Sequence, residues 1–367
     1  MKRVGVVSYN INCNFTNYGS ALQSWALCRQ LKKIGLEPIL VDYCPNIHLD
    51  SDPLNPSKKM WDQDLETLHN IEKLLPDIRE NYYKFENFYN THFQRTKKRY
   101  TSQNFEKIIE DERLDGFVCG SDTIFCIDEF KELDEAYFAN YNCMQGMSVA
   151  YAASFGDSHF STNDIQELKH HLKNFRAIGL RETGWLNFVR NNVDTNVQQV
   201  LDPTLLLSSE DYDAIAAERQ LESDYLLLYS RRYDKEMERF ADELACKFEL
   251  PIVEISIRAN NCNRHILRYD AGVEEFISLV KHARFIVTNS FHGIIFSTQY
   301  QIPFYCFTRE QGDAKIQELL SLLGLQERID ITAPTKMDFS ETQRRIEKYR
   351  IRSLNFLRKA IKTLHLL

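Results

Sequence analysis

The 367-residue chain has no apolar run close to the roughly 20 residues that a membrane-spanning helix needs. The apolar stretch within residues 1–7 is also too short for a secretory signal, so we expect a cytoplasmic protein. Nine cysteines are present, but no Cys-x-x-Cys pair, which argues against a disulfide framework and a zinc cage. We therefore expect no metal site.

Positive charge is in the minority, with 45 Lys and Arg against 52 Asp and Glu. This balance argues against a broad nucleic-acid-binding surface, and any anionic ligand would have to meet a local basic site. The Walker A, GxGxxG, HExxH and GxSxG signatures are absent, which excludes the common nucleotide-binding, metalloprotease and hydrolase sites. With 43% hydrophobic and 26% charged residues, the composition is that of a globular protein with a sizeable core.

What the sequence does contain is a repeated alternation of strand and helix patterns. A β-branched run at residues 3–8 is followed by helical spacing from Ala21 and by a second strand at residues 37–43. The alternation continues to about residue 201, and a second series runs from residue 225 to residue 307. Two such series predict an α/β protein with two Rossmann-like domains facing a cleft. We expect an N-terminal domain at 1–190, a C-terminal domain at 191–335 and a terminal helix within 336–367.

The last predicted helix, residues 338–364, is basic and amphipathic. Its cations could contact the inner face of a membrane, as a peripheral attachment. Leu354, Leu357, Ile361 and Leu364 nevertheless form an ordinary core stripe. We therefore favour a helix that packs back across the domain interface and leaves a solvated basic face.

Polar clusters follow several predicted strands, where open α/β sheets bind their ligands. In the first cluster, Gly19 permits a close approach and Ser20 can cap the following helix. Its free backbone N–H groups could hold an anion or sugar hydroxyls, although simple capping is the alternative. Three further side chains offer more hydrogen-bonding groups than a cap requires: Asn17, Tyr18 and Gln23.

Two more clusters carry charge. Gly120-Ser121-Asp122 ends a strand, and Asp122 is either a general base or a turn former. Arg181, at the end of another strand, could grip a phosphate or carboxylate in a fork that Lys cannot imitate, while Glu182 is a candidate ion-pair partner. Asp202, which precedes a proline, is most simply explained as a turn former.

The fourth cluster gives the clearest indication of a functional site. A β-branched strand at residues 285–288 passes through Asn289-Ser290 and Phe291 into His292-Gly293 at a helix start. His292 would then lie beside free backbone N–H groups and the positive end of a helix dipole, which suits anion binding and proton transfer. A lone histidine is usually structural, but this position in a crevice favours a functional role.

In this order, the clusters resemble those of the polysaccharide pyruvyl transferase family, over roughly residues 3–307. The resemblance implies a GT-B-like architecture with a C-terminal helix returning to the N-terminal domain. It also implies transfer of a pyruvyl group from phosphoenolpyruvate to two hydroxyls of a sugar, forming a cyclic ketal in a cell-surface polysaccharide or its lipid-linked precursor. Phosphoenolpyruvate is a co-substrate in this chemistry, and no cofactor is implied.

The resemblance also suggests residue roles. It implies that Arg181, Ser290, His292 and Gly293 bind the donor, with His292 also serving proton transfer and Asp122 serving as base. Because donor recognition then falls mainly on Arg181 and the second domain, the acceptor sugar would face Asn17, Tyr18, Gly19 and Gln23. Ser290 departs from the better understood branch of the family, which has a basic residue at this position.

Two other classes of function compete with this interpretation. A GT-B glycosyltransferase that uses a nucleotide-sugar donor could place a diphosphate at the same helix end near His292. A non-catalytic binding protein of a polysaccharide pathway would reduce Arg181 and His292 to structural roles.

Overall fold

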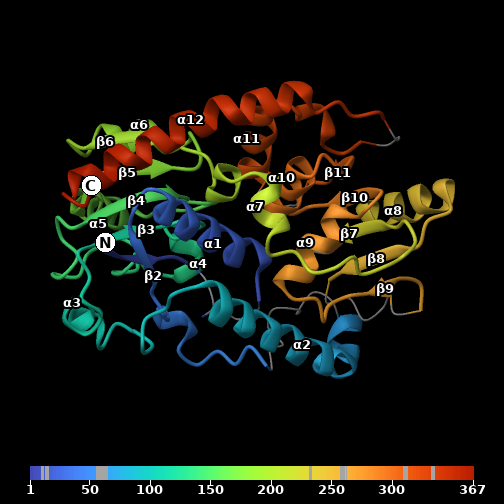
Figure 1. Cartoon of the computed structure of the whole chain (residues 1–367), viewed down its shortest axis with the longest axis horizontal. Coiled ribbons are helices and arrows are strands. Elements are labelled where there is room, and N and C mark those ends of the chain that lie inside the picture. Colours follow the sequence, from blue (N-terminus) through green and yellow to red (C-terminus); the bar gives the residue numbers. More distant parts are fainter. Residues whose placement is uncertain are drawn as a thin grey trace.

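The computed structural model of the chain describes residues 1–9, 12, 16–54, 65–230, 234–256, 261, 263–308, 313–331 and 335–367. Two parallel β-sheets with flanking helices form its two halves (Figure 1). We call the half with the six-stranded sheet the first unit and the half with the five-stranded sheet the second unit.

The strands of the first sheet are β1 (Arg3–Val7), β2 (Glu37–Leu40), β3 (Gly116–Cys119), β4 (Ser148–Ala153), β5 (Phe175–Leu180) and β6 (Asn196–Gln199). They run parallel in the order β2-β1-β3-β4-β5-β6. Val6 of β1 lies between Leu40 and Val118 in the register of the sheet. The inner strands β3 and β4 are fully buried because helices cover both faces of a parallel sheet, whereas the edge strand β6 is mostly polar.

The strands of the second sheet are β7 (Leu226–Tyr229), β8 (Ile252–Ile255), β9 (Ile266–Leu267), β10 (Phe285–Thr288) and β11 (Phe304–Cys306). They are also parallel, in the order β11-β10-β7-β8-β9. The predicted α/β class with two Rossmann-like series is therefore confirmed.

The helices follow the predicted alternation. Those of the first half of the chain are α1 (Tyr18–Lys33), α2 (Leu65–His92), α3 (Ile108–Glu112), α4 (Ile127–Phe130), α5 (Thr162–His171) and α6 (Leu186–Arg190). Those of the second half are α7 (Ser209–Asp213), α8 (Lys235–Phe248), α9 (Val273–Lys281), α10 (Phe291–Gln299), α11 (Asp313–Leu323) and α12 (Ser340–Thr363). Of the helices in the described ranges, none is both long and apolar enough to span a membrane.

The expected domain boundary at residue 190 is too early. β6 begins at Asn196 and pairs in parallel with β5, so the first sheet continues beyond that residue. The connection through α6 is short, and a short crossover places the next strand beside the previous one. The chain therefore changes units between β6 and β7, within residues 200–225.

Helix α12 returns to the first unit, as the sequence predicted. Phe356 packs against Gly179 of β5, where an added Cβ would run into the ring. The Ser353 hydroxyl accepts a hydrogen bond of 2.9 Å from the backbone N–H of Leu201. The two chain ends consequently lie close together on the first unit (Figure 1).

One apolar core joins the two units. It includes Leu22 of α1, Ile277 of α9, Ile294 of α10 and Phe356 of α12, all buried. Burial of each such side chain contributes roughly 1.5–3 kcal/mol. The starts of α1 and α10 are therefore held in fixed positions where the units meet.

Helix α2 adds polar ties between the units, since it follows β2 of the first unit but contacts the second unit. The Asn81 amide donates a 2.6 Å hydrogen bond to the carbonyl of Ala271. The Lys84 ammonium lies 3.0 Å from the Glu275 carboxylate, and His92 lies 3.2 Å from Glu274. These bonds connect α2 with α9 and the loop before it.

A buried carboxyl in the first unit gives a testable pH dependence. Asp134 accepts hydrogen bonds from the Tyr43 hydroxyl and from the N–H groups of Ala136 and Tyr137. Burial raises the pKa of Asp134 from 3.8 to about 7. The folded state therefore keeps a proton that the unfolded state releases, so stability is lost as pH rises through this window, by at most about 1.4 kcal/mol per pH unit.

We expect Asp134→Asn to remove this slope. The free energy of unfolding of the variant and the parent should be measured in urea from pH 4 to 8. The variant should gain stability relative to the parent as pH rises to about 7, and the difference should be constant above that pH. If the free energies of unfolding of the two proteins changed with pH in parallel, Asp134 would not be protonated in the folded state.

Candidate active site where the strand ends meet

The sequence clusters that follow β3, β5 and β10 converge in space. Asp122 follows β3, Arg181 follows β5 and His292 lies in the first turn of α10, directly after β10. Asp202, which follows β6, joins them. Because parallel strands present their carboxyl ends on one edge, the residues from the first unit collect there and meet α10 of the second unit.

Arg181 is the centre of this group. Its Nη1 lies 3.1 Å from Oδ2 of Asp202, and its Nη2 lies 3.6 Å from Oδ1 of Asp122. The Phe291 ring of α10 packs on the guanidinium, with 4.4 Å between Cζ and the ring centroid. Burial alone would lower the pKa of Arg181, but Asp122 and Asp202 outweigh it and raise this pKa. The buried Nε atom of Arg181 has no hydrogen-bond partner. Its N–H group could therefore donate a hydrogen bond to a ligand.

Asp202 does more than form a turn. Its Oδ1 accepts hydrogen bonds from the N–H and the hydroxyl of Thr204, capping the short 3₁₀ helix Pro203–Leu206. Its Oδ2 faces both Arg181 and the Nε2 of His292, which is 3.5 Å away. Burial would raise the pKa of Asp202, but His292 and Arg181 outweigh it and lower this pKa. Asp202 is therefore an ionised link between the two units.

His292 is held against Gly19 of α1. An added Cβ on Gly19 would overlap the imidazole, so only glycine allows the two helix starts to approach this closely. The Nε2 atom of His292 is buried and has no hydrogen-bond partner at normal bonding distance. This nitrogen faces Oδ2 of Asp202, at a distance longer than that of a normal hydrogen bond.

Asp122 is surrounded by donors. Its Oδ2 accepts a 2.8 Å bond from the Ser20 hydroxyl, and its Oδ1 accepts a 2.9 Å bond from the N–H of Thr123. Burial would raise the pKa of Asp122, but the charges of Arg181 and His292 outweigh it and lower this pKa. These contacts do not support the predicted role of general base. A carboxylate whose pKa is lowered and whose two oxygens already accept hydrogen bonds takes up a proton poorly. They suit a residue that orients Arg181.

Gln23 and Tyr18 do not face an acceptor, contrary to expectation. The Gln23 amide is fully buried: it donates to the Ser8 hydroxyl and accepts from the N–H of Ser121. The Tyr18 hydroxyl donates to the carbonyl of Ala271. Helix α1 is packed between the first sheet and α9, so its first turns form an internal contact and Gly19 faces His292 instead of a sugar.

Asn17 and Ser290 are helix caps. The Asn17 side chain accepts hydrogen bonds from Gly19 and Ser20, and the Ser290 hydroxyl accepts one from Gly293. An added Cβ on Gly293 would overlap the Thr288 hydroxyl, so this glycine serves local packing. The predicted donor contact of Ser290 is not supported, since its hydroxyl is buried and engaged in the cap.

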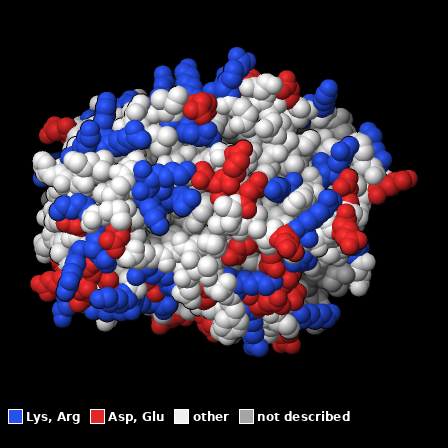
Figure 2. Space-filling view, viewed as in Figure 1, with Lys and Arg blue, Asp and Glu red and all other residues white. Residues whose placement is uncertain are grey.

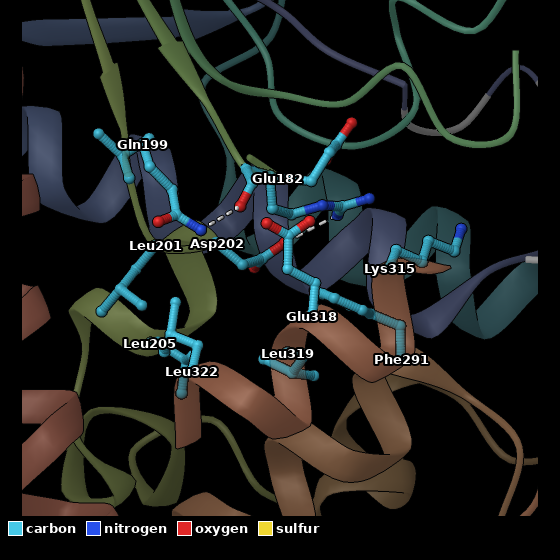
Figure 3. Close-up of a pocket in the computed structure, with 12 residues that line it drawn as sticks. Glu182, Gln199, Leu201, Asp202, Leu205, Phe291, Lys315, Glu318, Leu319 and Leu322 are labelled. Carbon is cyan, nitrogen blue, oxygen red and sulfur yellow. Dashed lines mark hydrogen bonds and ion pairs between the residues drawn. The ribbon is translucent and has the colours of Figure 1, made fainter. Parts of the chain in front are cut away.

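A small recess lies beside the network (Figure 3). Strand ends of the first unit form one wall, and α11 of the second unit forms another. The α11 residues on this wall were missed by the sequence analysis, although Ile316, Leu319, Leu320 and Leu323 have helical spacing. The polar and charged lining residues are Arg181, Glu182, Gln199, Asp202, Lys315 and Glu318.

Glu182 does not serve as the ion-pair partner of Arg181 that its sequence position suggested. Its Oε1 accepts a 2.6 Å hydrogen bond from the N–H of Phe155. Its side chain extends away from Asp202 (Figure 3). Burial raises the pKa of Glu182, although Arg181 and Lys315 act in the opposite direction. The ion-pair partners of Arg181 are instead the two aspartates.

Metal-ligating residues do not gather at this site. Within the part of the chain that the structure describes, no group of three or more His, Cys, Asp or Glu side chains is arranged to hold a metal ion.

Two parallel sheets whose strand ends meet, with a C-terminal helix returning to the first, define a GT-B-like protein. The chain is similar to the UDP-GlcNAc 2-epimerase from Methanocaldococcus jannaschii (TM-score 0.50, 12% identity, covering 95% of this chain and 93% of that one). It is also similar to a putative UDP-N-acetylglucosamine 2-epimerase from Listeria monocytogenes (TM-score 0.51, 10% identity, 100% and 92% coverage). At these identities the likeness establishes the fold alone.

The family is given by sequence. The model of the polysaccharide pyruvyl transferase family matches residues 17–311, and the chain belongs to that family. This range includes Asp122, Arg181, Asp202 and His292. A comparison with curated protein sequences finds no match.

Proposed function

We propose that this protein transfers a pyruvyl group from phosphoenolpyruvate to two hydroxyls of a sugar, in a cell-surface polysaccharide or its lipid-linked precursor. Family membership supports a transferase of polysaccharide biosynthesis. The observation that carries the proposal is the buried group of Arg181, Asp202 and His292 across the two units.

The donor carries a phosphate and a carboxylate. Arg181 is fixed by two aspartates and the Phe291 ring, and its Nε is without a partner. A planar guanidinium with an unused N–H suits either anionic group. The N-terminus of α10, where His292 lies, adds a positive dipole end. Because Asp122 and Asp202 already balance the charge of Arg181, the anion would be held by N–H donors of the guanidinium and of the helix end, and not by an excess of positive charge.

The reaction requires proton transfer without net proton release. The methylene carbon of phosphoenolpyruvate gains a proton, C2 forms bonds to two sugar oxygens, and the bond from C2 to the phosphate oxygen breaks. Of the two protons that leave the hydroxyls, one ends on the new methyl group and the other on the released phosphate. We assign this transfer to His292, because its Nε2 faces an ionised Asp202 that would stabilise the imidazolium.

The experiment is acceptor-dependent phosphate release from phosphoenolpyruvate, measured with a panel of synthetic and lipid-linked galactosides. We expect His292→Gln to lower the rate by about a hundredfold, the lower end of what proton transfer contributes. Arg181→Lys should raise the KM for phosphoenolpyruvate, because an ammonium group cannot make the two parallel hydrogen bonds of a guanidinium. The matched control is His159→Gln, since His159 is exposed and pairs with Asp128, which is not part of the network.

Each alternative function has a distinct outcome in the same assay. Turnover of a nucleotide sugar without use of phosphoenolpyruvate would contradict the proposal and indicate a glycosyltransferase. Binding of phosphoenolpyruvate with no turnover of any acceptor, unchanged in His292→Gln, would indicate a binding protein.

A further inference from the structure

Helix α12 presents a continuous cationic surface to solvent. Lys348, Arg352, Arg358, Lys359 and Lys362 are all exposed and fall on one side of the helix, because they are spaced by close to whole turns. From Lys348 to Thr363 the helix contains no Asp or Glu. Blue side chains accordingly line the edge of the molecule that α12 occupies in the view of Figure 1 (Figure 2).

The orientation of this surface is fixed by the opposite side of the helix. Ile346, Phe356, Leu357 and Ile361 are buried in the core shared by the two units. Arg350 also donates hydrogen bonds to the carbonyls of Leu205 and Leu207. The cations therefore cannot turn inward, and they remain exposed as one straight row.

An apolar side chain lies within the row. Ile351 is 52% exposed, although large apolar side chains are normally covered. It lies one turn after Lys348 and beside Arg352, while the nearby Glu347 is paired with Arg350. Cations combined with an apolar side chain on one helix face match the chemistry of a bilayer surface, where phosphates attract the charges and the acyl boundary accepts the isoleucine.

We propose that the outer face of α12, formed by Lys348, Ile351, Arg352, Arg358, Lys359 and Lys362, docks on an anionic lipid bilayer. From Lys348 to Lys362 this face is about 21 Å long, at 1.5 Å per residue. Outside residues 340–367 the chain has 37 Lys and Arg against 50 Asp and Glu, so the excess of positive charge on α12 contrasts with the rest of the protein. Binding should weaken as salt increases, because screening shortens the reach of exposed charges.

The test is flotation of the full chain with vesicles of phosphatidylglycerol and phosphatidylcholine, compared with vesicles of phosphatidylcholine alone. The parent should bind only the anionic vesicles, and high salt should release it. The triple variant Lys348→Glu, Arg352→Glu, Lys359→Glu should lower the partition coefficient by about a hundredfold. The matched control is Lys235→Glu, Arg239→Glu, Lys247→Glu, which changes net charge equally on exposed positions of α8.

Two outcomes would overturn the proposal. One is equal binding by the α12 triple variant and the α8 control. The other is equally tight binding of a soluble polyanion such as heparin with no effect of Ile351→Ser on vesicle binding, which would indicate an anionic polymer as partner. These results do not depend on the pyruvyl transfer reaction, because vesicle binding is measured without substrates.

Discussion

Gly19→Ala is expected to abolish phosphate release from phosphoenolpyruvate, lowering the rate by at least about a thousandfold. The added methyl would overlap the His292 imidazole, which must then move away from Asp202. The cost exceeds that of His292→Gln because the methyl also forces apart the starts of α1 and α10, which frame Arg181. We also expect a loss of about 1–3 kcal/mol in stability, typical of an overfilled core.

The matched control is Gly184→Ala, since a Cβ at Gly184 meets nothing within 4 Å and its φ is not in the left-handed region. Activity and the thermal midpoint should be unchanged in this control. Full activity of Gly19→Ala with a parental midpoint would contradict the contact between Gly19 and His292.

Asp202→Asn is expected to destabilise the folded protein by about 3–5 kcal/mol, as is typical when one partner of a buried ion pair is removed. The variant would leave the buried guanidinium of Arg181 with only the more distant Asp122. It would also remove the charge that faces Nε2 of His292. Urea unfolding at neutral pH measures the loss.

The pH dependence supplies a second readout for Asp202. Its pKa is lowered in the folded state, so its contribution is present at neutral pH and is lost only as pH falls below the usual range of an aspartate. The stability difference between parent and Asp202→Asn should therefore shrink in acid. The control is Asp224→Asn, whose exposed ion pair with Arg219 should cost less than about 1 kcal/mol. Equal losses in the two variants would contradict the buried network.

Much of the fold could be predicted because the strands of a parallel sheet are short apolar runs separated by helical periods. β1 and β10 lie within a residue of their predicted positions, and β7 begins one residue after the predicted start of the second series. β9 was missed, since its two residues are too short to show a period. The boundary at residue 190 was wrong because alternation does not reveal which sheet a strand joins.

The convergence of Asp122, Arg181 and His292 could also be predicted, since chemistry-bearing residues at parallel strand ends share one edge. What the sequence could not show is which polar atoms the fold uses internally. The polar groups of Gln23 and Ser290 are engaged within the protein, although their residue types suit a ligand equally well. Asp202 was predicted only to form a turn. In the structure one of its oxygens caps a turn, and the other faces Arg181 and His292.

The central claim is that the network of Arg181, Asp202 and His292 supports pyruvyl transfer to a sugar. The most direct test is phosphorus NMR of phosphoenolpyruvate with the parent protein and a galactoside panel, followed by mass spectrometry of the sugars. We predict that inorganic phosphate appears only with an acceptor, that this acceptor gains one pyruvyl group, and that neither occurs with Gly19→Ala. Consumption of a nucleotide sugar by the parent, with phosphoenolpyruvate untouched, would contradict the account.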